Sequence, residues 1–366
     1  EFSPDGRYLS YISDANGWSN LYLYDLQRDA HFPLVITEAE LAPCAWNQGM
    51  RSYAWSPDSA TIYYVRNQRG FLSLESVDLD TRATRPVAAM AEYSNLAHLA
   101  VSSRGRIAAI ASSSLIPPRI VACDAAASQP RIVARSDSET VPSSLLSEAQ
   151  PIDWPSGTGI QVHGLYYAPR CEQFEGAGKP PLIVLVHGGP TGQSLAGYHS
   201  RAQFFTTRGY AVLDVNYRGS SGYGRAYRRA LCEQWGIYDA DDVVSGARYL
   251  ASQGLVDQNK MVVMGGSAGG HTVLQCLIRY PGVFKAGLCL YGVTNLFTLA
   301  SDTHKLEQHY LDSLIGPLPE TAQRYRDRSP IFRADQIRDP VAVFQGQEDR
   351  VVPMDQLFLD LGLEAE

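Results

Sequence analysis

The second part of the chain alternates short apolar runs with stretches of helical period. The apolar runs have the length of buried strands in a parallel sheet. They lie at residues 181–186, 210–216, 261–264, 286–290 and 341–344. Between them, residues 240–252 place apolar side chains at three- and four-residue spacing, which is typical of an amphipathic helix. Residues 151–168 read as two strands around a turn. The pattern predicts an α/β fold whose mainly parallel sheet is covered by helices on both faces.

The first part of the chain has a different pattern, in which a polar turn precedes alternating, β-rich residues. The pattern occurs three times, and the turns begin at Ser3, Ser56 and Ser102. A spacing of roughly 50 residues is that of β-propeller blades with four short strands each. Because propellers typically have about four to eight blades, we predict the last blades of a propeller whose other blades precede Glu1. A small open β-sheet that is complete in itself is the alternative.

A polar segment separates the two patterns. Serine, glutamate, proline and threonine crowd together around residues 136–150, as they do in linkers between domains. We therefore predict two domains, with propeller blades over residues 1–140 and an α/β domain over residues 141–366. The sequence starts without methionine and ends within an apparent helix, so we expect the protein to extend beyond it at both ends.

Charge and cysteine content narrow the range of partners. The 366 residues carry a net charge of −7 and no basic stripe, which argues against a nucleic-acid partner. The apolar runs are far shorter than the ~20 residues of a membrane span, so no membrane partner is expected. The six cysteines lack C-x-x-C spacing. Their positions therefore indicate no metal site and no redox pair. Unpaired cysteines favour a cytoplasmic location.

The candidate chemistry centres on a serine between a strand and a helix. Ser267 lies within Gly265-Gly-Ser-Ala-Gly269, directly after an apolar run, and residues 268–280 have helical length before Pro281. This arrangement matches the G-x-S-x-G nucleophile elbow, in which a sharp turn exposes the serine hydroxyl above the strand ends. The flanking glycines remove side-chain bulk from such a turn. The alternative is a glycine-rich loop in which the serine has no catalytic role.

Two backbone amides are candidates for an oxyanion hole. The amide of Ala268 begins the helix after Ser267, where unpaired donors and the helix dipole stabilise negative charge. The run at 181–186 is followed by His187-Gly-Gly-Pro190. Its glycines allow an amide, that of Gly189, to approach a substrate oxygen. A tight turn is the alternative reason for these glycines.

Two further loops at the carboxyl ends of predicted strands contain candidate residues. The loop after the last apolar run offers Asp349 as the carboxylate that orients a triad histidine, with Glu348 as its competitor. The glycine-rich loop at residues 216–224 lacks the spacing of a phosphate-binding motif. We expect this loop near the active site, with Tyr217 or Tyr223 either in contact with substrate or packed within the loop.

The general base of the expected triad is not evident among the eight histidines. None of them follows Asp349, although the α/β-hydrolase order is serine, acid, histidine. His271 comes four residues after Ser267, so it lies one helical turn along and is expected to pack rather than to face the hydroxyl. Ordinary element lengths place about 30 residues between the acid and the base. We therefore expect the triad histidine beyond residue 366.

Together, the elbow, the Asp349 loop, the His187 loop and the repeats resemble the prolyl oligopeptidase family (S9) of serine peptidases. Tyr217-Arg-Gly-Ser-Ser-Gly-Tyr-Gly224 and Ser329-Pro330 look like further shared motifs. The resemblance implies an α/β-hydrolase catalytic domain preceded by a partial β-propeller, with Ser267 as nucleophile and Asp349 as acid. Prolyl oligopeptidases and dipeptidyl peptidases of the family IV type have tyrosine where this chain has His187. The chain therefore looks more like the acylaminoacyl-peptidase branch.

These features predict a serine peptidase that hydrolyses short peptides through an acyl-enzyme. The resemblance implies an oligopeptidase, dipeptidyl-peptidase or acylaminoacyl-peptidase activity that needs no metal and no other cofactor. Two alternatives stay open, namely a carboxylesterase on the same fold and a non-catalytic binding protein with the same domains. The sequence does not decide whether the protein forms a homo-oligomer.

Overall fold

A computed structural model describes residues 1–44, 46, 48–171, 176–302, 305, 307, 309–349 and 352. The contacts divide the chain into two compact units. The first consists of Glu1–Ala149, Leu195–Gln203 and Ser221–Ala226, and the second of Gln150–Ser194, Phe204–Ser220 and Tyr227–Glu366. The domain boundary after residue 140 that the sequence suggests stays a prediction.

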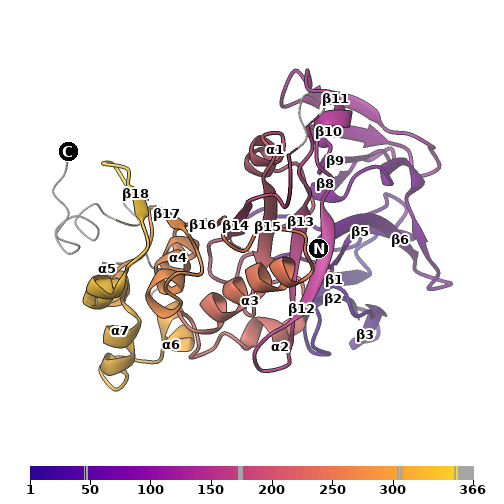
Figure 1. Ribbon diagram of the computed structural model, residues 1–366. Coiled ribbons are helices and arrows are strands. Elements are labelled where there is room, and N and C mark those ends of the chain that lie inside the picture. Colours follow the sequence, from indigo (N-terminus) through magenta and orange to yellow (C-terminus); the bar gives the residue numbers. More distant parts are fainter. Residues whose placement is uncertain are drawn as a thin grey trace. The chain divides into compact units, whose positions relative to one another are not determined.

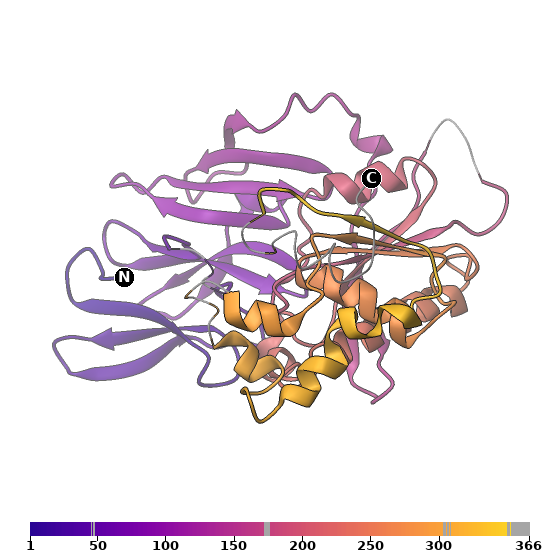
Figure 2. The ribbon, with the colours of Figure 1, turned by 90° about the vertical axis from the view of Figure 1, so that its left-hand side faces the viewer.

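The first unit contains three antiparallel sheets, which follow one another in chain order from indigo to magenta in Figure 2. The first sheet comprises β1 (Tyr8–Ser13), β2 (Asn20–Asp25) and β3 (Ala30–Val35). The second comprises β4 (Tyr53–Trp55), β5 (Thr61–Gln68), β6 (Phe71–Asp78) and β7 (Thr84–Pro86). The third comprises β8 (Asn95–Val101), β9 (Ile107–Ser113), β10 (Ile116–Cys123) and β11 (Arg131–Arg135). Two short 3-10 helices lie at Ala88–Met90 and Ser143–Leu145. The second and third sheets have the four strands expected of a blade, and the first has three described strands.

The repeated turns share one hydrogen-bond geometry. In each, the serine hydroxyl accepts a hydrogen bond from an amide at or just before the start of the following strand. The N–Oγ distances are 2.9 Å from Tyr8 to Ser3, 2.9 Å from Thr61 to Ser56, and 3.0 Å from Arg106 to Ser102. Serine side chains commonly close turns in this way. The sequence repeat is therefore also a structural repeat.

Consecutive sheets of the first unit pack through apolar side chains. Leu21 and Leu23 of β2 share a buried cluster with Ile62 of β5. Val65 of β5 belongs to a second cluster together with Ile107 of β9. Packing of successive four-stranded sheets on one another is the arrangement of propeller blades.

The second unit is built on a seven-stranded sheet with the order β12-β13-β15-β14-β16-β17-β18. Its strands are β12 (Gln150–Pro155), β13 (Gln161–Tyr167), β14 (Leu182–Val186), β15 (Ala211–Asn216), β16 (Met261–Gly266), β17 (Ala286–Leu290) and β18 (Val341–Phe344). Strands β14 to β18 are parallel, whereas β12 and β13 are antiparallel to their neighbours. The predicted apolar runs thus form the parallel strands, and residues 151–168 form the predicted hairpin.

Helices α3 (Tyr238–Ser252) and α4 (Ala268–Arg279) lie side by side against strands of this sheet (Figure 1). Their buried residues join those of β14, β15 and β16 in the largest apolar cluster. The remaining helices are α1 (Ser200–Thr206), α2 (Gly224–Arg229), α5 (Leu296–Asp302), α6 (Tyr310–Leu314), α7 (Ala322–Arg328) and a 3-10 segment at Pro330–Gln336. In the part of the chain that the structure describes, no helix combines the length and apolar character needed to cross a bilayer.

Candidate active site

Ser267 lies at a strained turn between β16 and α4. Its φ and ψ are 54° and −124°, a conformation that non-glycine residues rarely adopt. Backbone bonds hold it there, because its amide donates to Leu290 O at 3.1 Å and its carbonyl accepts from His271 N at 3.1 Å. Strain of this kind concentrates at functional sites. The geometry is that of the elbow which the sequence predicts.

The glycines of the elbow allow the helix to approach the strands. A β-carbon placed at Gly269 would lie 2.3 Å from the carbonyl oxygen of Val186 in β14. One placed at Gly265 would lie 2.5 Å from the carbonyl oxygen of Gly269. Real β-carbons do not come this close to backbone atoms, so a larger residue at either position would force α4 away from the sheet.

We expect Gly269→Ala to lower the free energy of unfolding by about 1–3 kcal/mol, the usual cost of overpacking. Urea unfolding at neutral pH measures the change. Gly157→Ala is the matched control, because a β-carbon at Gly157 has no atom within 4 Å. Equal stability of the two variants would contradict the proposed close approach of α4 to β14.

The loop after β14 lies beside the nucleophile. A β-carbon at Gly188 would be 3.6 Å from Cβ of Ser267, which is ordinary contact distance. Gly189 has a φ of 123° and is exposed, and the peptide bond between Gly189 and Pro190 is cis. A β-carbon at Gly189 would lie 2.6 Å from the amide nitrogen of Gly192, so glycine is required there. The loop therefore brings the backbone of two glycines, which have no side chains, close to Ser267.

Ser267, Ala268 and Gly189 line one pocket. The amide of Ala268 is at the first position of α4, where amides have no acceptor within the helix. Most of the other lining side chains are apolar, namely Pro190, Trp235, Val293, Leu299, Leu311 and Val352. Glu307 and Tyr310 add polar groups to the wall. The structure thus places a serine hydroxyl and both predicted oxyanion residues around one small pocket.

Two tyrosines hold the loop between Gly188 and Thr191. The hydroxyl of Tyr217 donates to the carbonyl oxygen of Pro190 at 2.8 Å and lies 3.2 Å from that of His187. The hydroxyl of Tyr310 lies 2.6 Å from Oγ1 of Thr191. Tyr217 is completely buried, which favours a supporting role over the substrate contact considered from the sequence. Tyr223 belongs to the first compact unit, and its predicted substrate contact stays a prediction.

Asp349 follows β18, two strands along the sheet from the strand that carries Ser267. Its amide donates to the carbonyl of Gly346 at 3.3 Å, which closes a turn. Its Oδ1 accepts the amide of Val352 at 3.0 Å. Because Val352 also lines the pocket, Asp349 is connected to the pocket wall by one hydrogen bond.

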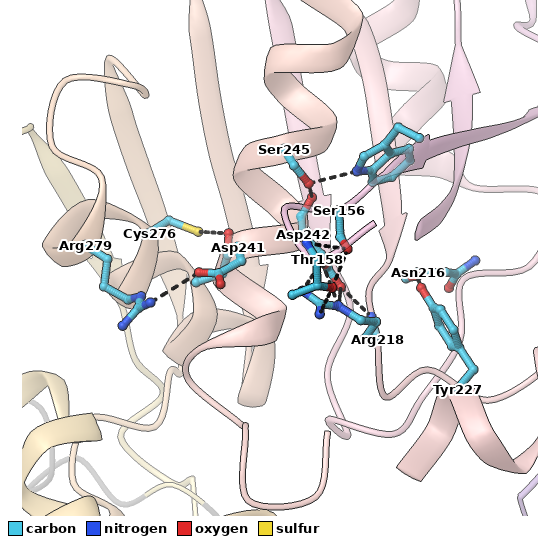
Figure 3. A network of polar contacts seen from close by, with 12 residues as sticks. Ser156, Thr158, Asn216, Arg218, Tyr227, Asp241, Asp242, Ser245, Cys276 and Arg279 are labelled. Carbon is cyan, nitrogen blue, oxygen red and sulfur yellow. Dashed lines mark hydrogen bonds and ion pairs between the residues drawn. The ribbon is translucent and has the colours of Figure 1, made fainter. Parts of the chain in front are cut away.

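A buried ion pair fixes the start of the glycine-rich loop after β15 (Figure 3). Arg218 and Asp242 of α3 are almost fully buried, and their closest N–O distance is 2.7 Å. The Arg218 amide also donates to Asp242 at 2.8 Å, and its guanidinium donates to Thr158 at 3.1 Å. A buried pair with its hydrogen bonds satisfied fixes geometry. Arg218 therefore holds the loop that continues into Ser220.

The chain is similar to several known proteins. The sequence profile of the prolyl oligopeptidase family (Peptidase_S9) matches residues 196–359. Dipeptidyl aminopeptidase BIII of Pseudoxanthomonas mexicana is 35% identical over 190 residues, which are 50% of this chain and 28% of that protein. A solved structure of a Mycobacterium tuberculosis puromycin-hydrolyzing peptidase is 34% identical over 96% of this chain and 53% of its own, with a TM-score of 0.90. Residues 196–359 of the chain therefore match the prolyl oligopeptidase family.

Acylamino-acid-releasing enzyme 2 of Oryza sativa subsp. japonica is another similar protein, 26% identical in an alignment that covers 96% of this chain and 51% of that enzyme. The chain spans about half or less of the length of each of these three proteins. The match to a solved structure over nearly the whole chain confirms the predicted fold class, an α/β-hydrolase domain preceded by propeller blades.

His271 packs beneath the elbow. Its side chain is fully buried against Trp235, with ring centroids 4.7 Å apart. Its Nε2 lies 2.8 Å from the carbonyl oxygen of Arg328, which can only accept, so Nε2 carries the proton. Burial lowers the pKa of His271 to about 4. The ring is a neutral packing residue, as its position in the helix suggests.

This pKa predicts acid sensitivity. The unfolded chain binds a proton at His271 below about pH 6.5, whereas the folded chain resists it until about pH 4. The free energy of unfolding therefore falls as the pH drops from about 6.5 to about 4, and His271 accounts for about 3 kcal/mol of this loss. We expect the wild type to lose that much more than His271→Gln between pH 7 and pH 4, measured by urea unfolding at each pH. Parallel pH profiles of the two proteins would contradict the assignment.

Among the described residues, no histidine nitrogen lies within hydrogen-bond distance of the Ser267 hydroxyl. His304 lies outside those residues. The described residues also contain no cluster of three or more potential metal ligands. A triad histidine beyond residue 366 stays a prediction.

Sequence reasoning missed most of the pocket wall. Val293 lies just after β17, and Leu299 lies within α5. Tyr310 and Leu311 begin α6, and Trp235 precedes α3. The available signal was topological, because ligands in open α/β sheets bind outside the carboxyl ends of the strands. Applied to the segment after Leu290, this rule would have identified part of the pocket wall.

Proposed function

We propose that the complete protein is a serine peptidase that hydrolyses short peptides through an acyl-enzyme. The observation that carries the proposal is the strained turn that presents Ser267 to the same pocket as Gly189 and Ala268. The names of the relatives support it. They are a dipeptidyl aminopeptidase, an acylamino-acid-releasing enzyme and a puromycin-hydrolyzing peptidase.

In the proposed mechanism, Ser267 Oγ attacks the carbonyl carbon of the scissile bond and gives its proton to a histidine beyond residue 366. The amides of Gly189 and Ala268 hold the negative oxygen of the tetrahedral intermediate. The histidine then protonates the leaving amine, and the acyl group remains on Ser267. Water attacks this ester, with the same histidine as base, and frees the enzyme. Asp349 orients the histidine throughout.

The pocket suggests which side chain precedes the scissile bond. Its wall is mainly apolar, and Glu307 also lines it. Filling an apolar pocket with a methylene typically contributes about 1–3 kcal/mol to discrimination. We propose that the substrate places a small or medium apolar side chain here.

All six cysteines are unpaired, and three of them are buried. Structural disulfides are rare in the reducing cytoplasm and common outside it. This usage supports our proposal of a cytoplasmic peptidase, which fractionation of the native host cells would test.

Labelling with a fluorophosphonate tests the function, because this reagent reacts with activated serine nucleophiles. The full-length protein should be labelled at Ser267, identified by mass spectrometry, and Ser267→Ala should not be labelled. Matched amide and ester substrates with the same acyl group then separate a peptidase from a carboxylesterase. Absence of label in folded wild-type protein would overturn the proposal in favour of a binding function.

A further inference from the structure

We propose that Asp239 is a positioning residue for the substrate pocket, because its carboxylate ties the wall residue Trp235 to the helix that begins at the elbow. The proposal rests on the peptidase function proposed above and adds a determinant of the side chain that the pocket accepts. Asp239 is completely buried. It is not among the residues that line the pocket, so it acts through its neighbours.

The carboxylate of Asp239 forms a link between α3 and α4. Its Oδ1 accepts a hydrogen bond from the amide of Gly236 at 2.7 Å, and its Oδ2 accepts one from the hydroxyl of Thr272 at 2.5 Å. Gly236 directly follows Trp235, which lines the pocket. Thr272 belongs to α4, the helix that starts directly after Ser267. One side chain of α3 therefore connects the backbone next to the pocket wall with the helix that carries the elbow.

Both hydrogen bonds of Asp239 are charge-assisted. Burial raises the pKa of Asp239 to about 6, so the carboxyl group is ionised at neutral pH. Hydrogen bonds to an ionised group are roughly twice as strong as those between neutral groups. Asp239 also lies in the first turn of α3, where the helix dipole stabilises negative charge. Because a buried carboxylate without donors is costly, the folded protein should keep both bonds.

Among the described residues, the bond from Gly236 to Asp239 is the shortest that holds the backbone of Trp235 and Gly236. The amide of Trp235 lies 3.4 Å from the carbonyl oxygen of Leu314, and its own carbonyl oxygen lies 3.3 Å from Nη1 of Arg328. Gly236 has a φ of 82°, in the left-handed region that glycine adopts easily. A glycine turn held by two long bonds can move. The short bond to Asp239 restricts this movement and thereby fixes Trp235.

The pocket is small enough for the position of this wall to matter. Its volume is about 60 Å³, whereas a cavity of about 150 Å³ accommodates benzene. Trp235 has the largest of the side chains that line it. Room for one more methylene group typically changes the relative kcat/KM of two substrates by about 10-fold or more. Asp239 therefore influences the size of the side chain that the pocket accepts.

Substrate selectivity tests the proposal, because loss of folded enzyme lowers the activity on all substrates equally and leaves their ratio unchanged. The assay uses the full-length protein and two chromogenic substrates that share a leaving group and place alanine or phenylalanine before the scissile bond. We expect Asp239→Ala to shift the ratio of the two kcat/KM values toward phenylalanine by about 10-fold. Thr272→Val removes the hydroxyl donor and keeps the shape, so it should shift the ratio in the same direction by about fivefold.

Two further variants are the controls. Asp239→Asn keeps an acceptor for Gly236 and should stay within about threefold of the wild-type ratio. Asp241 also joins α3 to α4, because it pairs with Arg279 at 3.3 Å (Figure 3), but its carboxylate binds Arg279 and Tyr280 instead of Gly236. Asp241→Asn should therefore leave the ratio unchanged. An unchanged ratio in Thr272→Val, or an equal shift in Asp241→Asn, would overturn the proposal, even if Asp239→Ala does not fold.

The indole N–H resonance of Trp235 provides a readout that does not depend on activity. In NMR spectra of the full-length protein, it is the indole signal that disappears in Trp235→Phe. We expect it to shift or broaden in Thr272→Val and to keep its wild-type position in Asp241→Asn. A wild-type signal in Thr272→Val would overturn the proposal. Failure of the wild type to label at Ser267 would instead overturn the peptidase function, and the indole signal would then decide alone whether Asp239 holds Trp235.

Discussion

Replacement of Ser267 by alanine in the full-length protein is expected to lower kcat for peptide hydrolysis by about 10⁶-fold. The reason is the loss of Oγ, the atom that forms the acyl-enzyme in the proposed mechanism. The pocket and both amides stay in place, so KM should change far less than kcat. Alanine also has the small side chain that the strained turn accepts, because the φ of 54° and the backbone bonds to Leu290 and His271 do not involve the hydroxyl.

Steady-state hydrolysis of a short chromogenic peptide measures this effect. The matched control is Ser252→Ala, at an exposed serine that ends α3 and donates to the carbonyl of Tyr249. We expect it to retain wild-type kcat. If Ser267→Ala kept more than about one hundredth of the wild-type rate, Ser267 would not be the nucleophile.

Replacement of Asp349 by asparagine should have the second largest effect, a fall in kcat of about 10⁴-fold. Asparagine has the shape of aspartate, and its Oδ1 can still accept a hydrogen bond from the amide of Val352. In the wild type this amide lies 3.0 Å from Oδ1 of Asp349. The turn should therefore persist. What is lost is the negative charge that, in the proposed mechanism, orients the triad histidine and stabilises its protonated form.

Glu348→Gln is the matched control for Asp349→Asn. Glu348 is the adjacent exposed carboxylate, and the sequence alone made it a competitor for the role of the acid. The change removes one charge at the neighbouring position, so kcat should stay within about threefold of wild type if Asp349 is the acid. The reverse ranking of the two variants would transfer the role to Glu348.

The parts of the fold that could be predicted from the sequence are those with local causes. Apolar runs gave the strands of the parallel sheet, and β17 and β18 have the predicted bounds. The elbow was recognisable because strand, glycines and helix follow one another within a few residues. In such segments, hydrophobic period and backbone sterics act on neighbouring residues, and both can be deduced from the sequence.

The parts that could not be predicted depend on contacts between distant segments. Tyr217 could have contacted either substrate or loop, and only its complete burial and its bond to Pro190 favour support of the loop. The pairing of His187 with Ser220 joins residues on loops after two different strands. Helices α5 and α6, of 7 and 5 residues, are too short for a helical period to reveal them.

The first compact unit consists of three separate stretches of the chain, which affects the order of folding during synthesis. It includes Leu195–Gln203, which comes after three strands of the second unit, and Ser221–Ala226, which comes after four. The amide of Arg225 donates to the carbonyl of Gly17 at 2.7 Å, and that of Ala196 donates to Gly70 at 2.8 Å. Domains usually fold one after another as they leave the ribosome. The first unit includes residues up to Ala226, so it can be complete only after four strands of the second unit have been synthesised.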